Sequence, residues 1–173
     1  MAKLTHPSPN YLKGRSGQKP HTIVIHITDG SLQSATSWFQ DPASGVSAHY
    51  VIGRNGEIRS FVKDEDTAWA NGRRYKPTWR NIPADNINVN SVTISIEHEG
   101  TAKSVWTKAQ KETSSTLIAD ICKKWNITPD ENTVIGHYSI YALKPNCPSF
   151  NRDQKGIIPE LIKTARKKLY GVA

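Results

Sequence analysis

Residues 21–28, HTIVIHIT, form a short and nearly continuous run of β-branched apolar residues. Such a run is typical of a central strand that is buried on both faces of a sheet. Within the run, the apolar pattern is interrupted by His26. A buried imidazole needs partners for both ring nitrogens, and neighbouring Ile and Val side chains offer none. The run therefore predicts a central strand and marks His26 as a residue with a further role.

Three segments on either side of this run predict further structure. Residues 47–63, SAHYVIGRNGEIRSFVK, hold two strand-like runs around Asn55-Gly56, and this dipeptide favours the positive φ angles of a two-residue hairpin turn. Residues 91–100, SVTISIEHEG, alternate as a strand does, and residues 133–137, TVIGH, form a short apolar strand. Between the hairpin and the alternating strand, residues 70–90 are rich in Asn, Arg, Pro and Trp and predict a long surface excursion.

Two segments predict amphipathic helices, because apolar residues recur at helical spacing from Thr107 to Trp125 and from Gly156 to Leu169. Strands come first and helices follow, so we expect an α/β fold with a central mixed β-sheet flanked by helices. A chain of 173 residues with 36% apolar content fills one core and is too short for two. Residues 1–20 predict an irregular N-terminal arm, and residues 21–173 form the single domain of an expected monomer.

The formal net charge is +8, from 23 basic and 15 acidic side chains. Such a charge attracts anionic polymers, whether nucleic acid, anionic lipid or an acidic cell wall, and does not choose among them. The chain has no interleaved aromatic and basic motif, so we expect no nucleic-acid binding. No window approaches the roughly 18 apolar residues of a membrane span. The N-terminal residues also lack the apolar segment of a secretory signal, so we expect a protein that stays in the cytoplasm where it is made.

The chain has two cysteines with different surroundings. Cys122 lies in a helical pattern, where a buried free thiol is the common outcome. Cys147 lies in the weakly periodic stretch GHYSIYALKPNCPSF, residues 136–150, ten residues after His137. We therefore expect both thiols to be free and Cys147 to be available for chemistry.

Two readings of this chemistry follow from the residues themselves. His26, His137 and Cys147 suit a tetrahedral Zn²⁺ whose fourth position stays open. Their spacing is less specific than paired CxxC motifs, and a lone strand histidine is more often a satisfied core residue. Alternatively, Cys147 acts as a nucleophile with His137 as its base, which leaves His26 unexplained.

The segments IVIHIT, SAHYVIGRNGEI, TAWANG, TISIEHEG, IGHY and KPNCPSF occur in this order. Together they resemble the zinc-dependent N-acetylmuramoyl-L-alanine amidases of the type 2 family, which share the fold of peptidoglycan recognition proteins. The resemblance covers about residues 20–165. It implies cleavage of the amide between N-acetylmuramic acid and L-alanine in bacterial peptidoglycan, with Zn²⁺ held by His26, His137 and Cys147. It also implies that Glu97 is the catalytic carboxylate, with Glu99 at a second acidic position.

The chain departs from the family pattern at the catalytic lysine. Many relatives place this lysine two residues before the third ligand, where this chain has Pro145, and Lys144 lies one residue further away. Lys144 is our candidate for stabilising the oxyanion if a shifted loop path brings it to the site. Otherwise Asn146, the zinc and other donors take over that role.

The chain also departs from the pattern around the cavity expected for the substrate. After Trp69, relatives often have a histidine and a small residue, where this chain has Ala70 and Asn71. Trp69 and Asn71 are our candidates for substrate binding, although Trp69 suits the core equally well. Some phage members use a tyrosine where this chain has Ala48, and we read His49 as structural or as supporting a ligand.

The resemblance predicts a phage or prophage endolysin that remains in the host cytoplasm until the membrane is breached. Two alternatives stay open, a bacterial wall-recycling amidase and a module that binds peptidoglycan without cutting it. Cys147 argues against the binding module, because non-catalytic members of this fold have lost that ligand.

Overall fold

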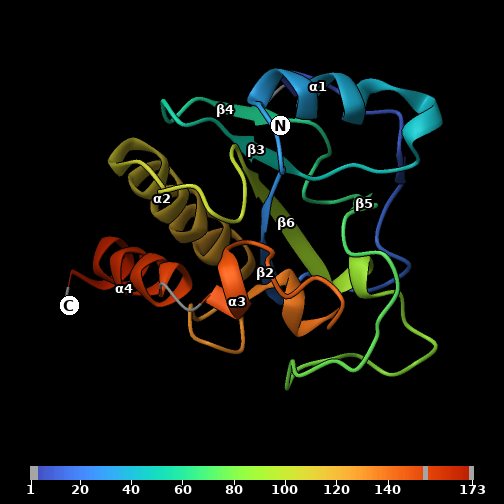
Figure 1. Ribbon diagram of the computed structural model, residues 1–173. Coiled ribbons are helices and arrows are strands. Elements are labelled where there is room, and N and C mark those ends of the chain that lie inside the picture. The colour runs from blue at the N-terminus through green and yellow to red at the C-terminus, as the bar shows by residue number, and fades with distance from the viewer. Residues whose placement is uncertain (1–3, 154–155, 172–173) are drawn as a thin grey trace.

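The computed structural model describes residues 4–153 and 156–171. Its main sheet has five strands in the order β4-β3-β6-β2-β7. Their bounds are Ile58–Ser60 for β4, Tyr50–Ile52 for β3, Thr93–His98 for β6, Thr22–Ile27 for β2 and Val134–Gly136 for β7. Neighbouring strands from β3 to β7 pair in parallel, and β4 is antiparallel to β3. The predicted central mixed sheet is confirmed (Figure 1).

The run that begins at His21 is a central strand, as predicted, because β2 pairs with β6 on one side and with β7 on the other. Alternate side chains of β2 point to opposite faces of the sheet. Ile23 and Ile25 enter the core under two helices, whereas Val24 and His26 point to the opposite face. All four are at most 1% exposed, so the strand is buried on both faces.

Two helices cover the face that carries Ile23 and Ile25. They are α2, Lys108–Trp125, and α4, Ile157–Tyr170, which lie side by side in Figure 1. Thr107 caps α2 by accepting a hydrogen bond from the Gln110 backbone N–H, and Asn126 ends the helix in the left-handed conformation. Both helices were predicted from apolar spacing, and both are confirmed.

In the part of the chain that the structure describes, the opposite face is covered at its two sides. Helix α1, Leu32–Gln40, packs on the β3 side through Leu32 and Phe39. On the other side, Trp79 and Val89 pack on Val24 of β2. The carboxyl ends of β2 and β6 lie between these two layers, and a cavity lined by His26 and Glu97 opens there.

Helix α1 was not predicted, although the sequence holds a signal for it. Ser31 accepts a hydrogen bond from the Ser34 backbone N–H, which is the pattern of an N-terminal cap. The buried residues of the helix recur at helical spacing and are Leu32, Ala35, Thr36 and Phe39. At nine residues the helix is short, so its stability comes from this packing.

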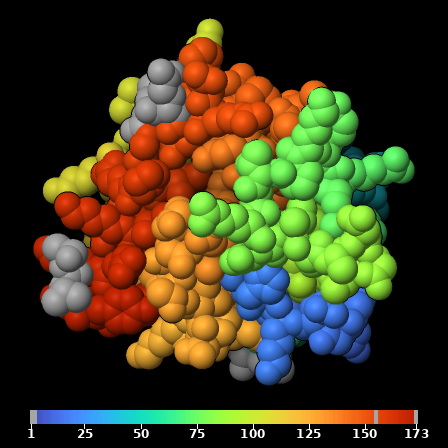
Figure 2. Space-filling model, turned by 90° about the horizontal axis from the view of Figure 1, so that it is seen from below, coloured from blue at the N-terminus to red at the C-terminus, as the bar shows by residue number. Residues whose placement is uncertain are grey.

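The predicted excursion is confirmed as a segment without helix or strand between β5, Thr67–Ala68, and the 3₁₀ turn η2, Val89–Val92. Its Trp79 is buried, and the indole N–H donates to the Asn132 carbonyl over 3.0 Å. The same ring lies 5.7 Å from that of His21. Figure 2 shows the green excursion beside the blue N-terminal part and the orange segment near residue 130.

The predicted hairpin is confirmed, but its turn differs from the expected two-residue turn. The Gly53 N–H donates to the Glu57 carbonyl, and the Gly56 N–H donates to the Gly53 carbonyl, so the loop has three residues. Only Gly56 has a positive φ, at +86°. The Asn55 side chain instead accepts the Glu57 N–H over 2.9 Å, which stabilises the three-residue turn without a positive φ at Asn55.

The predicted N-terminal arm is mostly irregular, yet it packs against the rest of the chain. Its residues Tyr11–Leu12 form β1, which pairs with β5. Ser8, Asn10 and Arg15 are each at most 5% exposed. Residues 1–3 of the arm lie outside the described residues.

Three short elements complete the described chain: η1, Pro42–Ser44, η3, His137–Ser139, and α3, Phe150–Asp153. Both cysteines are free, as predicted, with Cys122 buried in α2. Among the described residues, no helix has the length and apolar character to cross a membrane.

Candidate active site

Parallel strand pairing brings His26 and Glu97 together. The two are direct partners in the register of β2 and β6, and each is the fifth residue of its strand. Direct partners in neighbouring strands point to the same face of the sheet. His137 follows β7 directly, at the same edge. The carboxyl ends of three parallel strands thus deliver two imidazoles and one carboxylate to one place, which is where open α/β sheets bind ligands.

The loop after η3 supplies Cys147. A turn closes it, because the Cys147 N–H donates to the Lys144 carbonyl over 3.1 Å, and the Tyr138 N–H donates to the Cys147 carbonyl over 3.3 Å. Gly136 permits this arrangement, since any Cβ at that position would collide with the Tyr138 ring. A glycine immediately before His137 therefore allows the chain to fold back so that Cys147 approaches His26.

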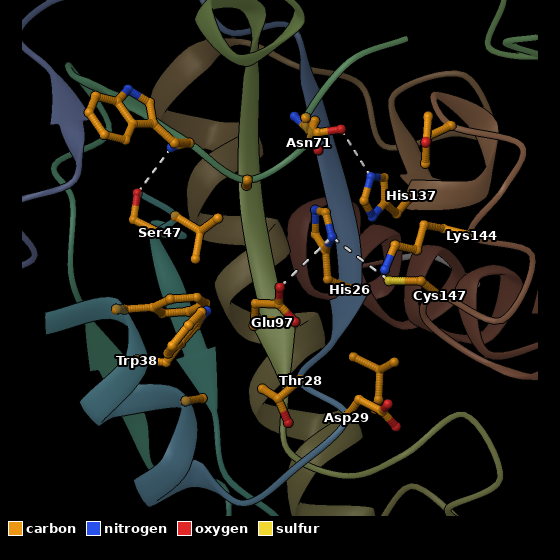
Figure 3. Close-up of a pocket in the computed structure, with 18 of the residues that line it drawn as sticks. His26, Thr28, Asp29, Trp38, Ser47, Asn71, Glu97, His137, Lys144 and Cys147 are labelled. Carbon is orange, nitrogen blue, oxygen red and sulfur yellow. Dashed lines mark hydrogen bonds and ion pairs between the residues drawn. The ribbon is translucent and has the colours of Figure 1, made fainter. Parts of the chain in front are cut away.

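His26, His137 and Cys147 form a compact donor set. One ligand atom from each lies within 4.8 Å of the others. The Cys147 Sγ is 3.8 Å from the His26 Nδ1, and the two imidazole centroids are 4.6 Å apart (Figure 3). Ligand atoms around a tetrahedral Zn²⁺ are separated by roughly 3.3–3.6 Å, given the usual bond lengths. The donor set can therefore hold a metal ion after only a small contraction.

The electrostatics of the donor set also suit a cation. Burial lowers the pKa of His26 well below its usual value, and the neighbouring His137 and His98 lower it further. Burial also lowers the pKa of His137. Both rings are thus neutral, which is the form that binds a metal.

Cys147 has the opposite shift, since burial and then the charge of Glu97 raise its pKa. A thiol with a raised pKa is a poor nucleophile, because the thiolate is the reactive form. Its sulfur lies 3.8 Å from the Nδ1 of His26, the residue that the cysteine-hydrolase reading leaves unexplained. These observations favour Cys147 as a ligand that ionises when a cation binds.

Glu97 lies beside the donor set, with its side chain 14% exposed. Its Oε1 lies 3.9 Å from the His26 Nδ1, and its Oε2 is buried with no hydrogen-bond partner among the described residues. Burial raises the pKa of this carboxyl to about 8, and the charge of Lys144 acts against the increase. A surface carboxylate on an edge strand has none of these features. Glu97 also lines an open cavity of about 1040 Å³, so it is available to a bound molecule.

Lys144 lines the same cavity despite its displaced position in the sequence. Its side chain turns toward Cys147 in Figure 3. Burial raises the pKa of Glu97 and that of Cys147, and the charge of Lys144 lowers both by a smaller amount. The loop path therefore compensates for Pro145, and the catalytic role of Lys144 stays a prediction.

The two predicted substrate-binding residues also line the cavity. Trp69 is half-buried at the cavity wall, and its backbone N–H donates to the Ser47 Oγ over 3.0 Å. Asn71 is only 1% exposed, and its backbone carbonyl accepts a hydrogen bond from the His137 Nε2. Contacts of Trp69 and Asn71 with a substrate stay predictions.

Three other residues marked by the family resemblance, Ala48, His49 and Glu99, do not line the cavity. His49 accepts the Ser95 backbone N–H over 3.0 Å, in agreement with a structural role. Ala48 is buried in the cluster beneath α1. The Glu99 carboxylate accepts the Arg54 backbone N–H over 2.8 Å. Glu97 is therefore the acidic residue of its segment that faces the donor set.

Sequence reasoning missed several residues that line the cavity, among them Trp38, Thr28 and Asp29. Trp38 comes from α1 and is 55% exposed (Figure 3). The helical pattern of residues 32–40 places Trp38 outside the buried stripe, which is the signal that would have found it. Thr28 and Asp29 directly follow β2, where the strand-end rule also points.

Comparison with solved structures shows where this fold occurs. The structure of an AmpD derivative aligns with a TM-score of 0.71 at 22% identity, covering 92% of this chain and 96% of that chain. The catalytic domain of XlyA aligns with a TM-score of 0.64 at 18% identity, covering 92% and 96%. A complex of the amidase AmiD from E. coli with anhydro-N-acetylmuramic acid-L-Ala-D-gamma-Glu-L-Lys has a TM-score of 0.57 at 27% identity, covering 72% and 51%.

Sequence comparison gives two relatives. N-acetylmuramoyl-L-alanine amidase A of Achromobacter lyticus is 28% identical over 149 residues, covering 75% of both chains. The 1,6-anhydro-N-acetylmuramyl-L-alanine amidase AmpD of Salmonella typhimurium is 30% identical over 157 residues, covering 73% of this chain and 80% of that one. A family model described as N-acetylmuramoyl-L-alanine amidase matches residues 16–150, which include the donor set and Glu97. With this match over most of its length, the chain belongs to the N-acetylmuramoyl-L-alanine amidase family.

Proposed function

We propose that this protein is a zinc-dependent hydrolase that cleaves the amide between N-acetylmuramic acid and L-alanine in bacterial peptidoglycan. The observation that carries the proposal is the donor set of His26, His137 and Cys147 beside the half-buried Glu97 in an open cavity. Three ligands with room for a fourth are typical of catalytic zinc sites, whereas structural sites use four protein ligands. When bound, Zn²⁺ polarises a carbonyl group and makes water a stronger acid.

Glu97 is the general base and then the general acid in this proposal. It accepts a proton as water adds to the scissile carbonyl carbon, and it gives the proton to the nitrogen of L-alanine as the C–N bond breaks. The products are a carboxylic acid on the glycan and a free amine on the peptide. Burial raises the pKa of Glu97 to about 8, and a nearby divalent cation lowers it toward the value that a base needs at neutral pH.

Lys144 stabilises the charge that develops on the carbonyl oxygen. Its ammonium group lines the cavity on the Cys147 side, where a donor fixed in advance favours the tetrahedral oxyanion over the planar substrate. Trp38 of α1 and Trp69, which follows β5, line the cavity and are the aromatic residues that we expect to contact the substrate. A substrate that bridges glycan and peptide needs an open cavity of this kind.

We further propose an endolysin that acts on intact walls after it leaves the cytoplasm in which it accumulates. Both endolysins and wall-recycling amidases occur among the similar proteins. The net charge of +8 supports the endolysin, because attraction to an anionic wall helps an enzyme with a polymeric substrate. A recycling amidase acts on small soluble fragments and needs no such attraction. Comparing turnover on intact walls with turnover on a soluble anhydromuropeptide distinguishes the two.

Metal analysis together with mass spectrometry of digested peptidoglycan tests the enzymatic proposal. We expect about one Zn²⁺ per chain and release of stem peptides with a free L-alanine amine. Chelation should stop the release, and added Zn²⁺ should restore it. Cys147→Ala should lose both the metal and the activity. An active protein without metal would contradict the zinc assignment, and wall binding without peptide release would indicate a binding module.

A further inference from the structure

Asn71 lies beside both histidines of the donor set (Figure 3). The His137 Nε2 lies 3.1 Å from the Asn71 backbone oxygen, which can only accept a hydrogen bond. The Nε2 of His137 therefore carries the proton. In a neutral imidazole this leaves the lone pair on Nδ1, and Nδ1 is the atom free to bind a metal.

The orientation of the Asn71 side chain is fixed by its neighbour Thr93. The Asn71 Nδ2 lies 2.9 Å from the Thr93 Oγ1, and this hydroxyl donates its own proton to the Val89 carbonyl over 3.0 Å. The hydroxyl must therefore accept from the Asn71 amide nitrogen. The Asn71 Oδ1 consequently points away from Thr93.

Two buried polar atoms near Asn71 lack conventional hydrogen-bond partners among the described residues. These atoms are the Asn71 Oδ1 and the His26 Nε2. One is an acceptor, and the other is a donor when His26 keeps Nδ1 free. Burial and the charges of His137 and His98 lower the pKa of His26, and hydrogen bonding to the Asn71 side chain acts in the opposite direction. In Figure 3 Asn71 lies over both rings.

We propose that Asn71 is the positioning residue for both metal-binding histidines. Its backbone oxygen holds the Nε2–H of His137, and its side-chain oxygen holds the Nε2–H of His26. Both rings then present Nδ1 to the ion. This inference rests on the proposed zinc site and deepens it, because partners of this kind fix the tautomer and the ring orientation of a ligand.

The surroundings of Asn71 suit this role. Its backbone N–H donates to the Asn90 Oδ1 over 2.9 Å, so η2 holds the residue at a third point. The residue is 1% exposed, which leaves little of it for a substrate.

Zinc affinity tests the proposal through Asn71→Ala, measured by competition with a chelator. This variant keeps the backbone contact with His137 and loses the side-chain contact with His26. We expect Zn²⁺ to bind about 10–100-fold more weakly than to the unchanged protein. Asn71→Asp keeps an acceptor oxygen for the His26 Nε2–H, although it loses the donor to Thr93, and should therefore bind Zn²⁺ more tightly than Asn71→Ala.

Asn10→Ala is the matched control, because Asn10 is 3% exposed and its amide donates only to residues far from the donor set. It should lose thermal stability while its folded fraction keeps normal zinc affinity. Equal affinity in Asn71→Ala and the unchanged protein would overturn the proposal, and so would equal weakening in both alanine variants.

A second measurement needs no variant and no metal. Long-range ¹H–¹⁵N correlation spectra of the metal-free protein should show the proton on Nε2 in both His26 and His137. A proton on Nδ1 of either ring would overturn the proposal even if zinc binds. Failure of the unchanged protein to bind Zn²⁺ would instead sink the proposed function, while these spectra would still decide the role of Asn71.

Discussion

Glu97 faces the donor set from β6 at a distance of 3.9 Å from the His26 Nδ1. Glu97→Gln keeps the size of the side chain and removes its ability to take a proton. General acid–base catalysis contributes roughly 10²–10⁴-fold, so we expect turnover to fall by about that factor. Zinc content and the thermal midpoint should stay near normal. Peptide release, zinc content and melting temperature measured on one preparation check this.

Glu99→Gln is the matched control, two residues along the same segment. The Glu99 carboxylate accepts a backbone N–H from Arg54 and does not line the cavity. The Glu99→Gln variant should keep normal turnover per folded molecule. Normal turnover in zinc-loaded Glu97→Gln would instead move the base elsewhere.

Lys144 is tested by removing its charge while keeping its length. Lys144→Met should lower the turnover number by about 10–1000-fold, because a donor aimed at a developing oxyanion is typically worth a few kcal/mol. Zinc affinity should change far less than turnover. Lys103→Met is the control, since Lys103 is exposed and does not line the cavity. Equal turnover in the two variants would remove Lys144 from the mechanism.

The parallel pairing of β2, β6 and β7 turns three separate sequence segments into one site. The strands were readable from their apolar patterns, and the motif order identified His26, His137 and Cys147. The role of Asn71 was not readable, because its bonds to His137 and Thr93 span 66 and 22 residues. Contacts of this kind depend on how loops pack, so the local periodicity of the sequence does not predict them.

The N-terminal arm shows the same limit at the level of an element. Its composition predicts an irregular segment, and nothing in it predicts that Arg15 is buried. The Arg15 Nε donates to the Asp64 carbonyl over 2.6 Å, and its Nη1 donates to the Ser91 and Thr93 carbonyls over 2.9 and 3.0 Å. Arg15 therefore ties the arm to the start of β6 and to the end of η2, which also holds Asn71.

We expect Arg15→Met to destabilise the fold by about 3–5 kcal/mol, because it leaves buried carbonyl groups without donors. Denaturant unfolding measures this. Lys13→Met is the control, since Lys13 is exposed in the same arm, and its effect should stay within about 0.5 kcal/mol. Similar stability of both variants would show that the arm is dispensable for the fold.

The whole molecule carries a formal net charge of +8, and part of the positive charge lies on the C-terminal helix α4. Lys163, Arg166 and Lys167 are exposed on α4 and do not line the cavity. Their field extends over a Debye length, about 10 Å at 0.1 M salt, and so acts on an approaching polymer rather than on the chemistry. Charge and catalysis are therefore separable by experiment.

Replacing Lys163, Arg166 and Lys167 by Gln lowers the formal charge from +8 by three, to +5. We expect this variant to hydrolyse intact walls more slowly at low salt and to lose less activity as salt is raised, because less attraction remains to be screened. Cleavage of a small neutral muropeptide should be unchanged, since that substrate gains little from a long-range field. Initial rates on both substrates across a salt series measure the two effects separately.

Equal salt dependence of the variant and the unchanged protein on walls would show that these residues do not attract the wall. A parallel loss on the neutral muropeptide would show that salt acts on the cavity itself, and the positive charge would then no longer support an enzyme adapted to intact walls.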